Sequence, residues 1–126
     1  MAEHVSENVF RVKSLTIQRI GGTFATFMRA AKSIIRPLIE FFRETNHNYT
    51  RFNYVGEWHS HPSFAPMPSV KDHRTMLEII EDPHLGALFV VLMIVKLNSA
   101  REIEGTVTAY KPGGIILKGE LIFEDR

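Results

Sequence analysis

The chain has 126 residues, of which 44% are hydrophobic and 23% are charged. A chain of this length can bury one core without disulfide or metal staples, and we expect a single domain over residues 1–126. The formal net charge of +1 provides no sequence-wide field that would indicate binding to nucleic acid or to an acidic membrane. The absence of cysteine excludes disulfides and thiolate ligands, so any metal must be held by nitrogen and oxygen atoms.

In the first half of the chain, the sequence pattern predicts a strand followed by a helix. Residues 8–18 are rich in Val, Phe, Leu and Ile, and their imperfect alternation predicts a strand with a bulge near Lys13–Ser14. Residues 24–45 place apolar side chains along one side of a helix. We expect a kink or restart at Pro37, because proline removes a backbone donor. The polar residues 46–48 predict the loop that ends this helix.

The second half of the chain predicts four strands and one helix. The apolar run at residues 87–97 is typical of a central strand that is covered on both faces. The helix is expected to bury Met76, Leu77, Ile79 and Ile80. This order predicts an α/β fold, with helices packed on a mixed β-sheet. The expected elements are a strand at 52–59, a helix that begins at 69 and ends at 82–83, a strand at 87–97, and strands at 103–110 and 115–123 joined by a hairpin turn at 111–114.

Targeting and membrane segments are not indicated by the sequence. The stretch MAEHVSENVF contains acidic side chains and lacks the apolar centre of a signal peptide. The longest apolar run, Ala87–Val95, is too short to span a bilayer. We therefore expect a cytoplasmic protein with no membrane partner.

Two histidines near the end of the strand predicted at 52–59 are candidates for a metal site. Residues two apart on a strand point to the same face, roughly 7 Å apart, so His59 and His61 face the same way. Divalent metals bind imidazole nitrogens at about 2.0–2.1 Å, which this spacing allows. Asp72 lies in the first turn of the next predicted helix, where the chain has had room to return past the strand's end. The three residues form a candidate set of metal ligands.

Each half of this pattern also has a purely structural interpretation. Most His-x-His pairs are surface or hydrogen-bonded histidines. Ser69 and Asp72 nearly form a capping box, in which Ser69 at the N-cap binds the amide of residue 72 and the helix dipole favours Asp72. Capping and metal binding are compatible, because capping would bring the Asp72 carboxylate back toward the histidines. The neighbouring His73 is interpreted as a solvated residue or as one that supports the site from outside.

The sequence HSHP at residues 59–62, followed by Ser69 and Asp72, resembles the JAMM motif of the JAB/MPN metallopeptidases. That motif consists of His-x-His, seven residues, Ser, two residues and Asp, and every fixed position is filled here. The preceding residues 54–58, YVGEW, are similar to those of the bacterial branch. The resemblance implies a cytidine-deaminase-like α/β fold, in which the two histidines and the aspartate bind zinc and a water takes the fourth position.

The same resemblance implies the chemistry of an amide hydrolase. Zinc would lower the pKa of the bound water and yield a hydroxide nucleophile. Ser69 would donate a hydrogen bond to the oxyanion of the tetrahedral intermediate, an effect worth about 3 kcal/mol. The bond cut would be a peptide or isopeptide amide, often at the C-terminal tail of a ubiquitin-like protein.

The family also uses an upstream glutamate as general base, and this chain does not show it in the expected context. Glu3 and Glu7 lie upstream, but neither is followed by the Gly-rich strand end typical of the family, and residues 1–8 resemble the tail of a strand or loop. Glu57 precedes His59 by two residues and so faces the candidate metal, where it is either a base or a hydrogen-bond partner of a ligand histidine. We retain Glu7 and Glu57 as candidate bases, and we expect the chain to be N-terminally short, without the family's first strand and its glutamate.

These observations lead to three functional hypotheses. The first is a zinc-dependent isopeptidase or peptidase acting on ubiquitin-like proteins or their conjugates, with homologues of ubiquitin-activating and ubiquitin-conjugating enzymes as further partners. The missing glutamate favours instead an inactive MPN-like module that recognises a ubiquitin-like protein or a partner subunit. A relative associated with DNA repair is the weakest hypothesis, since that branch of the superfamily carries Asn where this chain has Ser60.

Phe64 and Met67 lie in the loop beside the candidate metal site. They either pack against the protein or contact a substrate tail.

Overall fold

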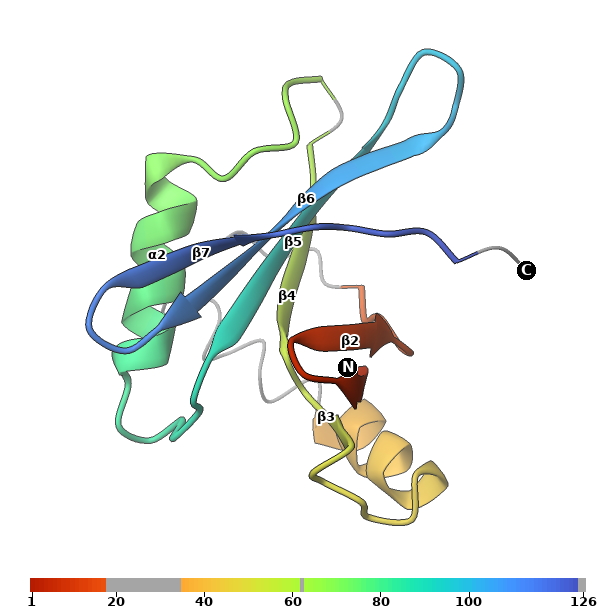
Figure 1. Cartoon of the computed structure of the whole chain (residues 1–126), viewed down its shortest axis with the longest axis vertical. Coiled ribbons are helices and arrows are strands. Elements are labelled where there is room, and N and C mark those ends of the chain that lie inside the picture. Colours follow the sequence, from red (N-terminus) through yellow and green to blue (C-terminus); the bar gives the residue numbers. More distant parts are fainter. Residues whose placement is uncertain (18–34, 62, 125–126) are drawn as a thin grey trace. The chain divides into compact units, whose positions relative to one another are not determined.

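A computed structural model of the chain describes residues 1–17, 35–61 and 63–124 (Figure 1). The chain divides into two compact units, Met1–Val55 and Gly56–Arg126. Each unit contains a β-sheet and a helix. This combination of sheets and helices confirms the α/β class that the order of elements predicts. The three candidate metal ligands all belong to the second unit.

The first unit contains a three-stranded antiparallel sheet. Asn8 takes a left-handed conformation with φ of 59°, which asparagine tolerates in tight turns, so the chain reverses direction at this residue. The strands, in the sheet order β2-β1-β3, are β2 (Val9–Val12), β1 (Ala2–Ser6) and β3 (Phe52–Asn53).

The strand predicted at residues 8–18 is only partly confirmed. β2 ends at Val12, and the N–H groups of Lys13 and Ser14 both donate to the Met1 carbonyl, at 3.1 and 3.2 Å. The bulge expected near Lys13–Ser14 is wrong, because the irregular register lies in β1, between residues 4 and 6. Residues 2–6 form a strand because the turn at Asn8 folds them back against β2.

The helix predicted at residues 24–45 is confirmed over residues 35–44. Its earlier part lies outside the described residues, and the kink expected at Pro37 stays a prediction. Phe41 is buried, and its ring meets that of Phe52 edge-on with centroids 6.2 Å apart. The predicted loop at 46–48 is confirmed. Asn46 and His47 both take left-handed conformations there, which ends the helix.

The second unit is built on a four-stranded mixed sheet. β4 and β5 are parallel neighbours, and the other neighbouring pairs are antiparallel. Because α2 joins β4 to β5, these three elements form a β-α-β crossover. The elements are β4 (Gly56–Ser60), α2 (Val70–Glu81), β5 (Val90–Leu97), β6 (Ile103–Lys111) and β7 (Ile115–Gly119), with the sheet order β4-β5-β6-β7.

The prediction of one continuous strand at residues 52–59 is wrong, since β3 and β4 belong to different sheets. Asn53 Oδ1 accepts a hydrogen bond from the Tyr54 N–H at 2.8 Å, a local contact that competes with strand pairing and ends β3. β4 then begins at Gly56. A Cβ atom at this position would lie 1.8 Å from the Val91 carbonyl oxygen, so only glycine permits this close approach of β4 to β5.

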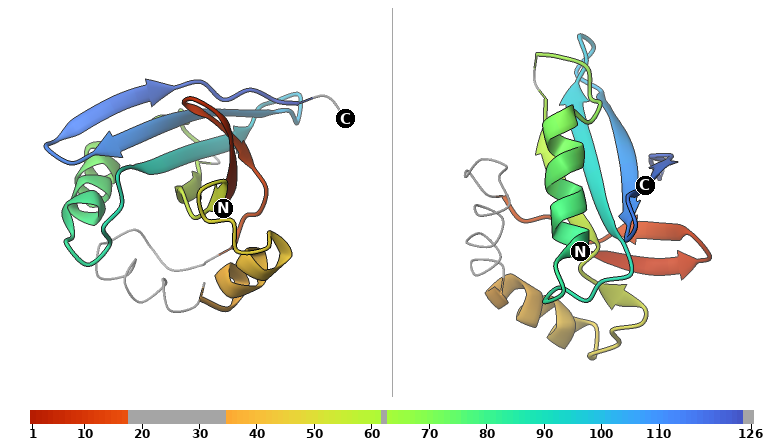
Figure 2. Two further views of the ribbon diagram at one scale, coloured as in Figure 1. Left: turned by 60° about the horizontal axis from the view of Figure 1, so that its bottom comes forward. Right: turned by 90° about the vertical axis from the view of Figure 1, so that its left-hand side faces the viewer.

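Helix α2 lies along one face of this sheet and packs against β5 and β6 (Figure 2). Three of the four residues predicted on its buried side are buried, whereas Leu77 is half-buried. β5 is the central strand that the apolar run predicts, since it pairs along both of its edges. Neither described helix is long and apolar enough to cross a membrane. The buried core residues are Met76, Ile79 and Ile80 on α2, and Val90, Leu92 and Ile94 on β5.

The hairpin predicted at residues 111–114 is confirmed as the turn between β6 and β7. Lys111 pairs with Ile115, which leaves residues 112–114 in the turn, and Gly113 and Gly114 have φ values of 86° and 74°, left-handed conformations that glycine adopts readily in hairpin turns. β7 ends at Gly119 and is shorter than the strand predicted at residues 115–123.

Candidate metal centre

Strand β4 presents His59 on the face of the sheet that α2 covers. His59 pairs in register with Ile94, which is fully buried on that face. His61 lies one residue beyond β4, but its N–H donates to the Val95 carbonyl at 2.9 Å, so the pairing with β5 continues through it. Both imidazoles therefore leave the chain on the same side, as strand alternation predicts.

The first turn of α2 holds Asp72 through a complete capping box. Ser69 is the N-cap, and its Oγ accepts the Asp72 N–H at 3.1 Å, while the Ser69 N–H donates to Asp72 Oδ2 at 2.8 Å. The other carboxylate oxygen, Oδ1, lies 3.6 Å from His59 Nδ1. Capping thus uses one oxygen of the carboxylate and leaves the other beside His59, so the two interpretations of the sequence are compatible.

His59, His61 and Asp72 come together into one cluster. Each offers a ligand atom, and these three atoms lie within 4.8 Å of one another. Ligands that are each about 2.1 Å from a tetrahedral ion stand roughly 3.4 Å apart, close to the observed separation of His59 and Asp72. Two imidazoles and one carboxylate with a fourth position open are a donor set that catalytic zinc sites use. The residues present therefore fit zinc.

The cluster is partly buried. The exposed fractions of the side chains are 33% for His59 and 15% for Asp72, and His61 is buried. The partial exposure of His59 leaves the cluster accessible to water, and the low exposure of the other two side chains strengthens electrostatic interactions among the three.

The orientation of His61 is set by the loop that follows it. His61 Nδ1 lies 3.3 Å from the Ala65 carbonyl, and because a carbonyl only accepts, Nδ1 carries the proton and Nε2 keeps its lone pair for a cation. The Phe64 ring leans on the His61 imidazole with centroids 4.3 Å apart. The Thr106 hydroxyl of β6 donates to the Pro66 carbonyl, which ties this loop to the sheet.

A polar contact between His73 and Tyr110 joins the first turn of α2 to β6. His73 Nδ1 lies 2.9 Å from the hydroxyl of Tyr110, a residue that is completely buried. Burial, with a smaller contribution from the negative charge of Asp72, raises the pKa of Tyr110 to about 12, and a hydrogen bond with Thr108 opposes this shift. The sequence left open whether His73 was solvated, and it did not single out Tyr110, because alternation along β6 does not reveal which residue meets α2.

The two candidate bases occupy different units. Glu57 pairs in register with Leu92 on β5, so it faces the same side of the sheet as His59, as alternation predicts. Glu7 is exposed in the turn between β1 and β2 of the first unit. The roles of Glu7, Glu57 and Ser69 in a reaction stay predictions.

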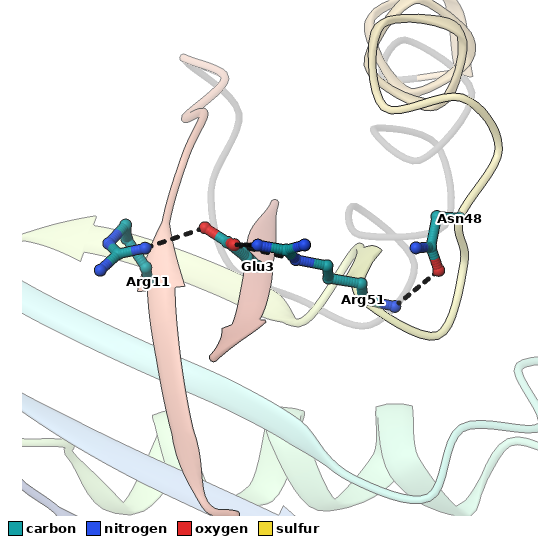
Figure 3. Close-up of polar contacts among 4 residues, drawn as sticks. All are labelled: Glu3, Arg11, Asn48 and Arg51. Atoms are coloured by element: carbon teal, nitrogen blue, oxygen red, sulfur yellow. Dashed lines mark hydrogen bonds and ion pairs between the residues drawn. The ribbon is translucent and has the colours of Figure 1, made fainter. Parts of the chain in front are cut away.

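Glu3 serves a structural role in the first unit (Figure 3). It is buried, and its carboxylate binds Arg51 through Nε and Nη2 at 3.0 and 2.6 Å and Arg11 Nη1 at 3.0 Å. The hydrogen bond from Arg51 lowers the pKa of Glu3, burial opposes this shift, and Arg11 supports it. A carboxylate held ionised by two guanidinium groups is a poor proton acceptor, so Glu3 is not suited to be the general base.

Comparison with known proteins assigns the chain to a family. The profile of the prokaryotic homologs of the JAB domain matches residues 6–107. Over 69 residues the chain is 36% identical to the CD-NTase/cGAS isopeptidase of Enterobacter hormaechei subsp. hoffmannii (strain UCI 50), an alignment that covers 55% of this chain and 35% of that protein. The chain thus matches about a third of the length of this relative. No solved structure matches the chain. Since the family profile covers most of the sequence, including both histidines and the aspartate of the cluster, the chain belongs to the family of prokaryotic homologs of the JAB domain.

Proposed function

We propose that this protein is a zinc-dependent isopeptidase or peptidase that cleaves the tails or conjugates of ubiquitin-like proteins. The observation that carries the proposal is the convergence of His59, His61 and Asp72 within 4.8 Å, with Ser69 hydrogen-bonded to Asp72 beside them. Membership of the JAB-domain family and a relative named as an isopeptidase support the same reaction class.

Zinc held by these three residues would supply a Lewis acid and an activated water at neutral pH. The protein's own contribution begins with Ser69. Its Oγ serves as acceptor in the capping box, so its hydroxyl proton is available for the oxygen that gains charge when the amide carbonyl is attacked. One such preorganised donor is worth about 3–4 kcal/mol of transition-state stabilisation.

Proton transfer to the leaving amine requires a general base that then acts as an acid. Glu57 and Glu7 are the proposed candidates. Glu57→Gln and Glu7→Gln test them separately, since loss of the base should lower kcat and remove the acidic limb of the pH–rate profile. A variant that keeps both the rate and this limb excludes its glutamate from the role.

The proposed substrate is an isopeptide or peptide bond at the C-terminus of a ubiquitin-like protein. By analogy with the name of the relative, we propose that the acceptor is a CD-NTase or cGAS-like enzyme. Homologues of ubiquitin-activating and ubiquitin-conjugating enzymes would then be functional partners, and the reaction would take place in the cytoplasm.

The test uses the purified chain and a ubiquitin-like protein fused through its tail to a fluorescent protein. We expect about one zinc per chain, and cleavage that a chelator stops and added zinc restores. His59→Ala should lose both properties, whereas His84→Ala, which changes an exposed histidine outside the cluster, should lose neither. Absence of zinc from the purified protein, together with normal behaviour of His59→Ala, would refute the proposal.

A binding module without catalysis is the second candidate, and the pairing of Glu3 with two arginines favours it. Because this pairing makes Glu3 a poor proton acceptor, one of the glutamates upstream of the motif is not suited to be the general base. A binding module would take up zinc and retain the ubiquitin-like tail on an affinity column, with no turnover of the fusion protein. Chelator-sensitive turnover would exclude this alternative.

A further inference from the structure

The capping box orients the Asp72 carboxylate relative to its own helix, but not relative to the histidines. Its two hydrogen bonds both stay within residues 69–72. His59 and His61 belong to the sheet side of the site, so their distance from Asp72 depends on the rotation and position of α2 above the sheet. Side chains project outward from a helix, so their directions change when the helix turns about its own axis. A small rotation of α2 would therefore move Asp72 away from His59.

Apolar packing by itself fixes this rotation weakly at the first turn. The buried side chains of α2 begin at Met76, one turn beyond Asp72. Such contacts are not directional, and they tolerate small shifts in a way that hydrogen bonds do not. A directional contact close to Asp72 is needed to define where its free oxygen points.

Two polar contacts with β6 supply that direction from either side of Asp72. Ahead of the helix, Thr106 Oγ1 donates to the Pro66 carbonyl. Within the first turn, the Tyr110 hydroxyl and His73 Nδ1 form a hydrogen bond of 2.9 Å. Thr106 and Tyr110 pair with Ile94 and Val90 of β5, both buried under α2, so both side chains point toward the helix.

The Tyr110 hydroxyl is well suited to this role. Tyr110 is completely buried, and its ring meets that of His73 at 60° with centroids 5.7 Å apart. The hydroxyl also bonds Thr108 of its own strand, so His73 is the partner that α2 supplies. Losing a hydrogen bond to a buried hydroxyl is costly, and the helix rotation that forms this bond is therefore favoured over neighbouring rotations. His73 follows Asp72 directly in the chain, and fixing one residue therefore fixes the direction of the other.

We propose that Tyr110 and His73 are positioning residues, which hold the first turn of α2 in the rotation that points Asp72 Oδ1 at His59 for metal binding. The inference rests on the proposed metal site. It assigns to the pair an effect on metal affinity and on coordination geometry, in addition to the effect on stability that any buried hydrogen bond has.

The test measures zinc affinity by competition with a chromophoric chelator, and coordination geometry from the visible absorption of the cobalt(II)-substituted protein. Tyr110→Phe removes only the hydroxyl, and His73→Leu removes only its partner. Both should bind zinc about tenfold more weakly, the lower end of what removal of supporting partners costs at metal sites, with an altered cobalt spectrum. The double variant should bind zinc no more weakly than either single variant, because both changes break the same hydrogen bond between α2 and β6.

Two further variants separate positioning from general stability. His73→Asn keeps a polar atom at the position of Nδ1 and should restore affinity and spectrum to nearly wild-type values. Ile80→Val trims a buried residue on the same side of α2, and it should lower thermal stability with no change in zinc affinity. Tyr110→Phe with wild-type affinity and spectrum, in a protein where His59→Ala abolishes binding, would overturn the inference alone. A wild-type chain that binds no zinc would overturn the proposed function and this inference together.

Discussion

Replacing Asp72 by asparagine should separate the capping role that the structure shows from the metal-binding role that we propose. Oδ2 accepts the Ser69 N–H at 2.8 Å, whereas Oδ1 lies 3.6 Å from His59 Nδ1. Asparagine has a single oxygen, and the cap needs that oxygen because the contact requires an acceptor. The NH2 group, which cannot bind a cation, is then directed at the histidines. We expect D72N to keep the cap and to lose the metal.

The sizes of the stability changes follow from these contacts. In the presence of a chelator, D72N loses only a negative charge at a helix N-terminus, which costs about 0.3–1 kcal/mol. D72A also leaves the Ser69 N–H without its acceptor, and the loss of a cap adds about 1 kcal/mol. S69A loses the Oγ acceptor, again about 1 kcal/mol, but it keeps all three proposed ligands.

Urea unfolding with and without zinc measures both roles in one experiment. Zinc at 100 times its Kd should stabilise the wild-type chain by about 2.7 kcal/mol, and S69A should show a comparable gain at the same multiple of its own Kd. D72N and D72A should gain nothing at the zinc concentration used for the wild type. The reasoning is refuted if zinc stabilises D72N as much as the wild type, or if D72N in chelator is as unstable as D72A.

The acid stability of the first unit should depend on Glu3. Because pairing lowers the pKa of Glu3 in the folded state, its stabilisation is complete above the unfolded-state pKa of about 4.3 and is lost as the pH falls through the folded-state value. Glu3→Gln should therefore flatten the pH dependence of urea unfolding in that acidic range, and an unchanged slope would contradict this role. Phe64 is 57% exposed beside His61, so Phe64→Ala, assayed with zinc in saturating excess, should lower kcat/KM for the tail fusion about tenfold, or about 1.4 kcal/mol; equal kcat/KM would exclude contact with the tail. Gly56→Ala would place a methyl group 1.8 Å from the Val91 carbonyl and should cost about 1–3 kcal/mol in urea unfolding. Gly119→Ala, whose Cβ would lie no closer than 3.4 Å to any neighbour, is the matched control and should stay within about 0.5 kcal/mol of the wild type.

The parts of the site that the sequence predicts are those that depend on local geometry. Strand alternation places His59 and His61 on one side, and the spacing of Ser69 and Asp72 matches a capping box. Both features are set within a few residues, and the structure shows both. The buried side of α2 and the hairpin at 111–114 follow from the same kind of local pattern.

The features that the sequence analysis missed depend on contacts between distant segments. β3 and β4 join different sheets because β3 pairs with β1, whereas β4 approaches β5 closely where Gly56 meets Val91, and both partner strands lie far away in the sequence. The pairing of His73 with Tyr110 depends on the register of β6 against β5 and on the rotation of α2. Alternation identifies which residues share a face of a strand, but it does not give the register between two strands.

The placement of the cluster raises an electrostatic problem that Asp72 resolves. The site lies where β4 ends and α2 begins, the edge at which open α/β sheets commonly bind ligands. The positive end of a helix dipole attracts anions and disfavours cations, so a metal would be repelled by the bare N-terminus of α2. The Asp72 carboxylate lies between the N-terminus of α2 and the proposed metal position, since Oδ2 accepts the Ser69 N–H and Oδ1 lies beside His59. The carboxylate would therefore make this helix end, which would otherwise favour anions, suitable for the proposed cation. For this reason a neutral residue at position 72 should weaken zinc binding more than the loss of one neutral ligand would.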